Sequence, residues 1–114
     1  MRKKYLILAK AFTHKGKLLA TATNDYEKSH PVMKYFATKV GLPEKEYLHA
    51  EIHAILRCKD KIPFLISVER YNNDGNMALA KPCNVCREAI KAYGVQFVKY
   101  TTESGWVTEC VEDW

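Results

Sequence analysis

The sequence lacks a long hydrophobic run, and this absence limits the kind of protein it encodes. Its longest apolar stretch, Tyr5–Ala9, is far shorter than the roughly 18 residues that a membrane-spanning helix needs. Basic residues 2–4 precede that stretch, but Lys10 interrupts it and no small-residue cleavage site follows, which argues against a signal peptide. Internal repeats, low-complexity segments and linkers are also missing. With 47% hydrophobic and 27% charged residues, the chain is expected to form one globular domain, residues 1–114, in the cytoplasm.

Cysteine is too sparse to indicate a disulfide-rich miniature, because the chain has 4 cysteines in 114 residues. In a cytoplasmic chain, cysteines favour metal binding or catalysis over disulfides. Two of them form the Cys-x-x-Cys pair Cys83 and Cys86. A second such pair, which a four-cysteine zinc site requires, is absent. Another residue must therefore complete any metal site.

Acidic residues are scarce in the first part of the chain. Residues 1–45 contain 10 Lys or Arg but only 3 Asp or Glu, whereas residues 46–114 contain 8 and 10, and the net charge is +5. The basic part favours an anionic partner such as a nucleotide, a polynucleotide or an acidic surface. The alternative is a solvated charged surface without a partner.

The pattern of apolar residues and turn signals predicts alternating strands and helices. Strands are expected at residues 5–12 and 18–23, which form a hairpin, and at 64–71, 76–80, 95–101 and 106–111; helices are expected at 31–40, 48–59 and 82–93. The last two strands are joined by about four residues, too few for a parallel crossover, so they are expected to pair antiparallel. The predicted fold class is α/β: a sandwich with a mixed sheet of about five strands and helices on its faces.

One imidazole and two thiolates are expected to meet where two of these helices begin. His49 stands at the start of one helix and Cys83 at the start of another, and Cys86 shares a helical face with Cys83. Three ligands leave the fourth position of a tetrahedral zinc ion open to water, which is typical of a catalytic site. Glu51, two residues after His49, faces another side of the helix and is placed to move a proton from that water to a leaving nitrogen.

These motifs resemble the signature of the zinc-dependent cytidine and deoxycytidylate deaminase superfamily. His49-Ala50-Glu51 and Pro82-Cys83-Asn84-Val85-Cys86 match it without a gap. The resemblance implies a cytidine-deaminase-like α/β/α sandwich. It also implies that His49, Cys83 and Cys86 bind Zn²⁺ and that Glu51 shuttles protons. A zinc-bound hydroxide would attack C4 of cytosine, or C6 of adenine, and ammonia would leave.

Three residues near the end of the hairpin are candidates for substrate binding. Family members place an asparagine there, so the resemblance implies that Asn24 contacts substrate, although asparagine is also a common turn residue. Tyr26 is a candidate platform for base stacking, and His30 is a candidate for stacking or phosphate contact. The alternatives are that Tyr26 belongs to the core and that His30 only begins a helix. The same two interpretations apply to four further aromatic residues: Tyr35, Phe36, Tyr71 and Trp106.

The remaining histidine and cysteines have simpler interpretations. His53 follows His49 by four residues, but the order His-x-Glu-x-His differs from the metalloprotease motif His-Glu-x-x-His. We therefore expect His53 to be packed, or to lie just outside the metal ligands, rather than to bind metal. Cys58 and Cys110 are expected to be buried thiols.

The resemblance does not fix which deaminase this is. An antiparallel final hairpin is similar to free-cytidine and secreted-toxin deaminases. It departs from the deoxycytidylate, tRNA adenosine and polynucleotide cytidine deaminases, which place a helix between parallel strands. The expected first strand and the His-Ala-Glu motif depart from the free-cytidine enzymes, so the chain looks most like a small, divergent, phage-like member, which would act in the host cytoplasm. Family members of this size are often homo-oligomers.

Three functions follow as hypotheses. The first is a hydrolytic deaminase that converts cytosine to uracil in a (deoxy)cytidine nucleoside or nucleotide. The second is a cytosine deaminase on single-stranded DNA or RNA, which the net charge favours. The third is a zinc-stabilised nucleic-acid-binding module without turnover, against which the presence of Glu51 argues.

Overall fold

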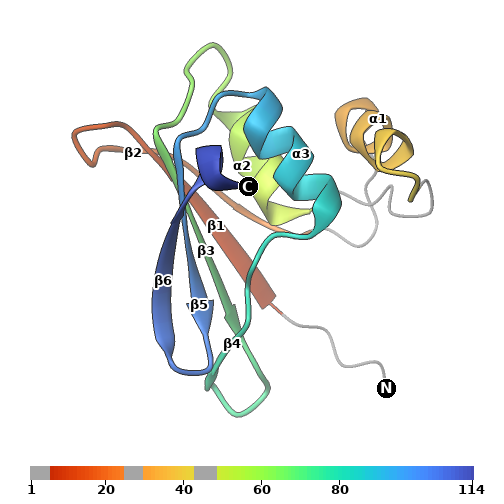
Figure 1. Cartoon of the computed structure of the whole chain (residues 1–114). Coiled ribbons are helices and arrows are strands. Elements are labelled where there is room, and N and C mark those ends of the chain that lie inside the picture. The colour runs from red at the N-terminus through yellow and green to blue at the C-terminus, as the bar shows by residue number, and fades with distance from the viewer. Residues whose placement is uncertain (1–5, 25–29, 43–48) are drawn as a thin grey trace.

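The computed structural model describes residues 6–24, 30–42 and 49–114 and is built on a mixed β-sheet (Figure 1). Its strands are β1 (Leu6–Phe12), β2 (Leu18–Thr23), β3 (Leu65–Tyr71), β4 (Met77–Ala78), β5 (Phe97–Thr102) and β6 (Gly105–Cys110). The order across the sheet is β2-β1-β3-β5-β6, and the two-residue β4 pairs with the end of β3. Among the described strands, β3 and β5 run parallel and every other pair runs antiparallel.

The described helices lie together on one side of this sheet (Figure 1). They are α1 (Pro31–Lys39), α2 (Ala50–Arg57) and α3 (Asn84–Ala92), and a 3-10 turn, η1 (Val111–Asp113), follows β6. α2 packs on β1, β2 and β3, and α3 contacts α1 and α2. Apolar side chains from both layers fill the space between them, among them Ile66, Val68, Val98, Ile52 and Ile90, all buried. Burying one such side chain contributes about 1.5–3 kcal/mol, so this packing holds the helices against the sheet.

Local sequence signals explain how α1 begins and ends. The ring Nδ1 of His30 accepts a hydrogen bond from the Val32 N–H at 3.1 Å, and Pro31 occupies the first helical position. Gly41 has φ +77, a conformation that glycine adopts without strain, and the Leu42 N–H then bonds to the Ala37 carbonyl at 2.8 Å. The helix is therefore closed at both ends by residues that the sequence pattern identifies.

The predicted element order and fold class are confirmed. The N-terminal hairpin, the short strand before the third helix and the antiparallel pairing of the last two strands are all present. The helices are shorter than expected: α2 begins at Ala50 rather than near residue 48, and α3 begins at Asn84, two residues after Pro82. Helix ends are the least certain part of such predictions.

The described helices share one face of the sheet. In the described residues all three helices cover one face of the sheet, and the opposite face carries a polar row. Lys10, Ser67 and Lys99 are direct neighbours on β1, β3 and β5, while Ala9, Val68 and Val98 point to the helices. Because side chains alternate along a strand, such strands need only one covered face. None of the described helices is long and apolar enough to cross a membrane.

Candidate metal centre

The two predicted motifs are brought together by the first residues of α2 and α3. His49 is the residue that precedes α2, with φ −78 and ψ 153, and Cys83 holds the same position before α3, with φ −71 and ψ 172. Neither side chain makes a capping hydrogen bond to its own helix. Extended backbone at these positions instead directs both side chains to the space between the two helix starts. Cys86, in the first turn of α3, completes the group.

The three donor atoms are close enough to share one ion. The Nδ1 atom of His49 lies 3.2 Å from the Sγ of Cys86 and 3.5 Å from the Sγ of Cys83, and all three lie within 4.8 Å of one another. Ligands of a tetrahedral zinc ion, at their usual bond lengths, lie about 3.4–3.8 Å from one another. Distances and donor types both fit zinc, which prefers nitrogen and sulfur ligands. His49, Cys83 and Cys86 are the one such group among the described residues.

The pKa values of the two thiols are shifted in opposite directions. The Cys86 thiol hydrogen-bonds to Cys83, and together with a contact from His49 this lowers the pKa of Cys83 to about 3. Because Cys86 donates that hydrogen bond and is fully buried, the pKa of Cys86 is raised well above its ordinary value. One of the two sulfurs thus ionises readily and the other does not. A cation between them would favour the thiolate form of both, as metal ligation by cysteine requires.

Glu51 is a buried carboxylate beside this group. Its side chain is 5% exposed, which makes it the most buried acidic or basic residue that the structure describes. Burial raises the pKa of Glu51, while the nearby His49 opposes that rise, and the carboxylate also interacts with the Cys86 thiol. Burying an ionised carboxylate away from water lowers the stability of the folded state, so keeping Glu51 at this position costs the fold some stability. A carboxyl group whose pKa is raised by burial is suited to accept and return a proton near neutral pH.

Asn24 lies at the end of β2, where its side chain holds β1 in place. Its Oδ1 accepts a hydrogen bond from the Ile7 N–H at 3.2 Å, and its own N–H bonds to the Ile7 carbonyl at 3.3 Å. The neighbouring Thr23 carbonyl lies 3.3 Å from Nδ1 of His53, which is one helical turn after His49. The end of β2 therefore lies beside the first turns of α2. Substrate contact by Asn24 remains a prediction.

His53 is packed, as predicted, and is not part of the metal group. Its Nδ1 meets the Thr23 carbonyl, and its Nε2 accepts a hydrogen bond from Nε of Arg57 at 3.1 Å. A neutral ring with its proton on Nδ1 satisfies both contacts. Arg57 also donates to the Thr21 carbonyl at 3.1 Å. The pair therefore fastens α2 to β2.

The remaining candidates are placed as follows. His30 caps α1, which is its simpler interpretation, and a role in substrate binding stays a prediction. Tyr26 lies outside the described residues. Cys58 is buried in the core, as expected, whereas Cys110 is only partly buried. Both thiols are free.

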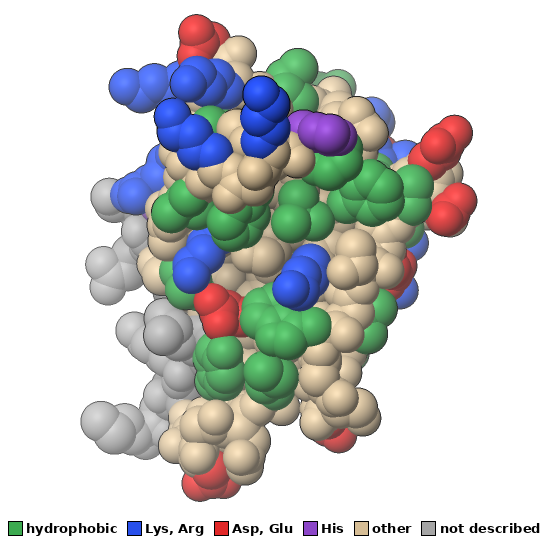
Figure 2. All heavy atoms as spheres, turned by 90° about the vertical axis from the view of Figure 1, so that its left-hand side faces the viewer, with side chains coloured by type: hydrophobic (Ala, Val, Ile, Leu, Met, Phe, Trp, Pro, Cys, Tyr) green, Lys and Arg blue, Asp and Glu red, His purple; other side chains and the backbone are tan. Residues whose placement is uncertain are grey.

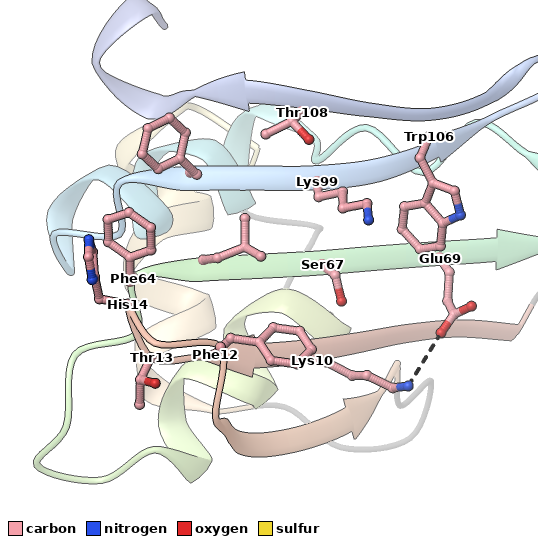
Figure 3. Close-up of a pocket in the computed structure, with 13 residues that line it drawn as sticks. Lys10, Phe12, Thr13, His14, Phe64, Ser67, Glu69, Lys99, Trp106 and Thr108 are labelled. Carbon is pink, nitrogen blue, oxygen red and sulfur yellow. Dashed lines mark ion pairs between the residues drawn. The ribbon is translucent and has the colours of Figure 1, made fainter.

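A second feature, which we did not predict from the sequence, is an open hollow on the helix-free face of the sheet (Figures 2 and 3). Lys10, Lys99 and Trp106 are among its lining residues. The available signal was the alternation of strand residues, because Lys10 and Phe12, like Phe97 and Lys99, are two apart and so share a face.

Comparison with known proteins agrees with this geometry. A family model described as the cytidine and deoxycytidylate deaminase zinc-binding region matches residues 7–102. Among solved structures, a cytidine deaminase from Mycobacterium leprae is similar with a TM-score of 0.50 and 22% identity, covering 92% of this chain and 75% of its own. A mutant cytidine deaminase from Mycobacterium tuberculosis gives a TM-score of 0.52 at 16% identity, covering 96% and 75%. No curated protein sequence matches the chain.

Proposed function

The chain belongs to the cytidine and deoxycytidylate deaminase family, and we propose that it hydrolyses the exocyclic amine of cytosine in a (deoxy)cytidine nucleoside or nucleotide. The observation that carries the proposal is Glu51, a buried carboxylate beside three donor atoms that fit zinc. A site that only stabilised the fold would need the three donors but not the carboxylate. Its presence favours turnover over a purely structural role.

In the proposed reaction, three residues of the chain hold the metal ion and a fourth transfers protons. His49, Cys83 and Cys86 would hold the ion, which when bound supplies a Lewis acid that lowers the pKa of a water molecule. The Glu51 carboxylate would take one proton from the attacking water and deliver it to N3 of the base. It would then carry the second proton of that water to the amine, which leaves as ammonia. Burial holds the pKa of Glu51 above its ordinary value, so the protonated form is accessible when the proton has to be given back.

Substrate recognition is assigned to the hairpin end. We place Asn24 against the sugar or base because β2 ends beside the first turns of α2. Tyr26 and His30 follow it in the chain and are proposed to stack on the base or meet a phosphate. His30 uses Nδ1 to cap α1, so any contact to substrate would involve the rest of its ring.

A polynucleotide substrate is the second candidate, and the net charge of +5 favours it. Single-stranded DNA or RNA binds through several phosphates, each neutralised by a lysine or arginine. A free nucleotide offers fewer phosphates, and a nucleoside offers none. The cations that distinguish the basic part of the chain include Lys10, Lys15 and Lys17, which the structure describes.

The test is a mass-spectrometric deamination assay on the purified, zinc-loaded chain. Cytidine, deoxycytidine, their monophosphates and a cytosine-containing single-stranded oligonucleotide are supplied separately. We expect the monomers to be converted to the corresponding uracil nucleosides and nucleotides. Glu51→Gln, which keeps the size of the side chain, should lower the rate by roughly 10²–10⁴-fold, the usual contribution of a positioned acid–base group.

Each other outcome assigns the function differently. Conversion of the oligonucleotide alone would replace the first candidate by the second. Full activity in Glu51→Gln would refute the proton-transfer role. An inactive chain that still binds zinc would leave the structural module as the explanation.

A further inference from the structure

The helix-free face of the sheet holds an open hollow of about 710 Å³ (Figure 3). Aromatic residues lie at both of its ends. Phe64 stacks edge to face with His14, at 4.7 Å between ring centroids, and its ring lies 5.2 Å from that of Phe97. Trp106, on β6, lies beyond the middle of the hollow and is 40% exposed. Exposed aromatic rings on a sheet offer flat surfaces on which other rings can stack.

A row of cations separates the aromatic residues. Lys10 and Lys99 flank Ser67, each as its direct neighbour across the sheet. The Lys99 Nζ lies 4.9 Å from the Trp106 ring centroid, and the Lys10 Nζ lies 4.0 Å from a carboxylate oxygen of Glu69. Figure 2 shows basic side chains among the hydrophobic ones on this face. Glu69 is the one acidic residue among those that line the hollow, so the lysines outnumber the carboxylates there.

The charge decides between the possible occupants. A second copy of the chain, placed face to face, would set the same excess of lysine against itself, and like charges brought together at an interface oppose association. An apolar peptide would leave Lys99 without an anion, because the one carboxylate in the hollow, that of Glu69, already faces Lys10. An anionic chain that also carries flat rings satisfies the lysines and the aromatic residues at once. Single-stranded nucleic acid has this chemistry, and proteins bind it through stacking on aromatic residues beside a positive groove.

We infer that this face is a binding surface for single-stranded nucleic acid, with bases stacked on Trp106 and on the Phe64–Phe97 pair and phosphates on Lys10 and Lys99. It lies on the other side of the sheet from His49, because residues that point to the helices alternate with those that line the hollow. The surface is therefore separate from the metal centre. Sheets that bind RNA in this way typically stack two or three bases.

Separation from the metal centre allows a test that is independent of deamination. The probe is a fluorescein-labelled oligothymidylate of about 12 nucleotides, which is within the range of site sizes of domains that bind single strands. Thymine has no exocyclic amine and cannot be deaminated. Binding is measured by fluorescence anisotropy on the zinc-loaded chain, so an inactive enzyme and an empty surface give different results.

The first comparison is between two exposed aromatic residues. Trp106→Ala should weaken binding by about 5- to 150-fold, the effect of losing one stacked base. Tyr35→Ala is the matched control, since Tyr35 is 62% exposed but lies on α1, away from the hollow. The control should bind as the unmodified chain does. Equal effects in both variants, or none in either, would overturn the inference.

The second comparison uses charge and needs no change in the aromatic residues. Lys99→Gln should weaken binding and reduce the slope of log K against log salt concentration by about 0.7, the value for one phosphate contact on a single strand. Lys39→Gln, on α1, is its control and should leave the slope unchanged. An unchanged slope in Lys99→Gln would contradict the phosphate contact.

Two further measurements complete the test. In Trp114→Phe, Trp106 is the one tryptophan left, and the oligonucleotide should quench its fluorescence if a base stacks there. Sedimentation measures whether the chain self-associates. A dimer that Trp106→Ala or Lys99→Gln dissociates, together with no oligonucleotide binding, would show that a second copy occupies the face and would overturn the inference.

Discussion

Replacing Cys86 by serine should remove most of the stabilisation that zinc gives to the fold. A ligand at 100 times its dissociation constant stabilises a protein by about 2.7 kcal/mol. For a domain of this size, about 4 °C of melting temperature corresponds to each kcal/mol, so zinc at that concentration should raise the melting temperature by about 10 °C. Removing a residue that only hydrogen-bonds to a metal ligand typically weakens metal binding by about 10–100-fold. Removing the ligand Cys86 itself should therefore weaken zinc binding by at least about 100-fold.

If zinc binds Cys86→Ser about 100-fold more weakly, the same zinc concentration only equals the dissociation constant of this variant. The stabilisation then falls to about 0.4 kcal/mol, and the shift in melting temperature falls to about 2 °C. The assay is differential scanning fluorimetry over a zinc titration, with bound zinc measured by elemental analysis. Because both states of each variant are compared, any change in the stability of the zinc-free chain cancels.

Cys58→Ser is the matched control for this substitution. Cys58 is 6% exposed and its thiol donates to the Ala54 carbonyl at 3.3 Å, so serine replaces a buried thiol by a hydroxyl that keeps the hydrogen bond. Its zinc-dependent shift should remain about 10 °C. A full shift in Cys86→Ser, or its loss in both variants, would refute the assignment of Cys86 as a ligand.

Three further predictions concern the fold around the site. Ile66→Ala, at a fully buried position of β3, should lower the free energy of unfolding by about 2–5 kcal/mol in urea titrations, and a smaller loss would mean that the core closes around the cavity. His53→Ala should destabilise α2 by about 1 kcal/mol through the lost hydrogen bonds but leave zinc content unchanged, whereas zinc loss would make His53 a ligand. The Tyr100 hydroxyl, Trp114 and Lys81 hold the pKa of Glu109 below its ordinary value of 4.5, so Glu109 stabilises the fold above that pH and loses the effect as the pH falls through its lowered pKa. The stability difference between the unmodified chain and Glu109→Gln should therefore shrink on acidification, and a constant difference would contradict this.

Much of the fold could be predicted because local signals and burial agree. His30–Pro31 and Gly41 mark the ends of α1, and the short link at residues 103–104 forces β6 to return antiparallel to β5. The number of helical layers could not be predicted in the same way. It depends on whether a surface is covered, and strand alternation shows which side chains share a face but not what lies over it.

The metal ligands could be predicted because their chemistry limits the choice. Two thiols three residues apart need a third ligand, and His49 also precedes a helix. The sequence does not show that the two thiols ionise differently. That difference arises from the complete burial of Cys86 and its hydrogen bond to Cys83, both of which depend on how α2 and α3 pack.

The two candidate surfaces should respond independently to substitution, because β5 contributes to each layer through different side chains. Val98 points to the core between the sheet and the helices, and its neighbours Phe97 and Lys99 line the hollow on the other face. Lys99→Gln changes a partly exposed side chain that makes no contact with the metal group, so its zinc-dependent shift should stay near the roughly 10 °C of the unmodified chain. Cys86→Ser should conversely leave oligothymidylate binding intact wherever the chain remains folded. If one substitution changed both properties, the buried side chains between the two faces, Ile66, Val68 and Val98, would have to couple them, and the independence of the two surfaces would be refuted.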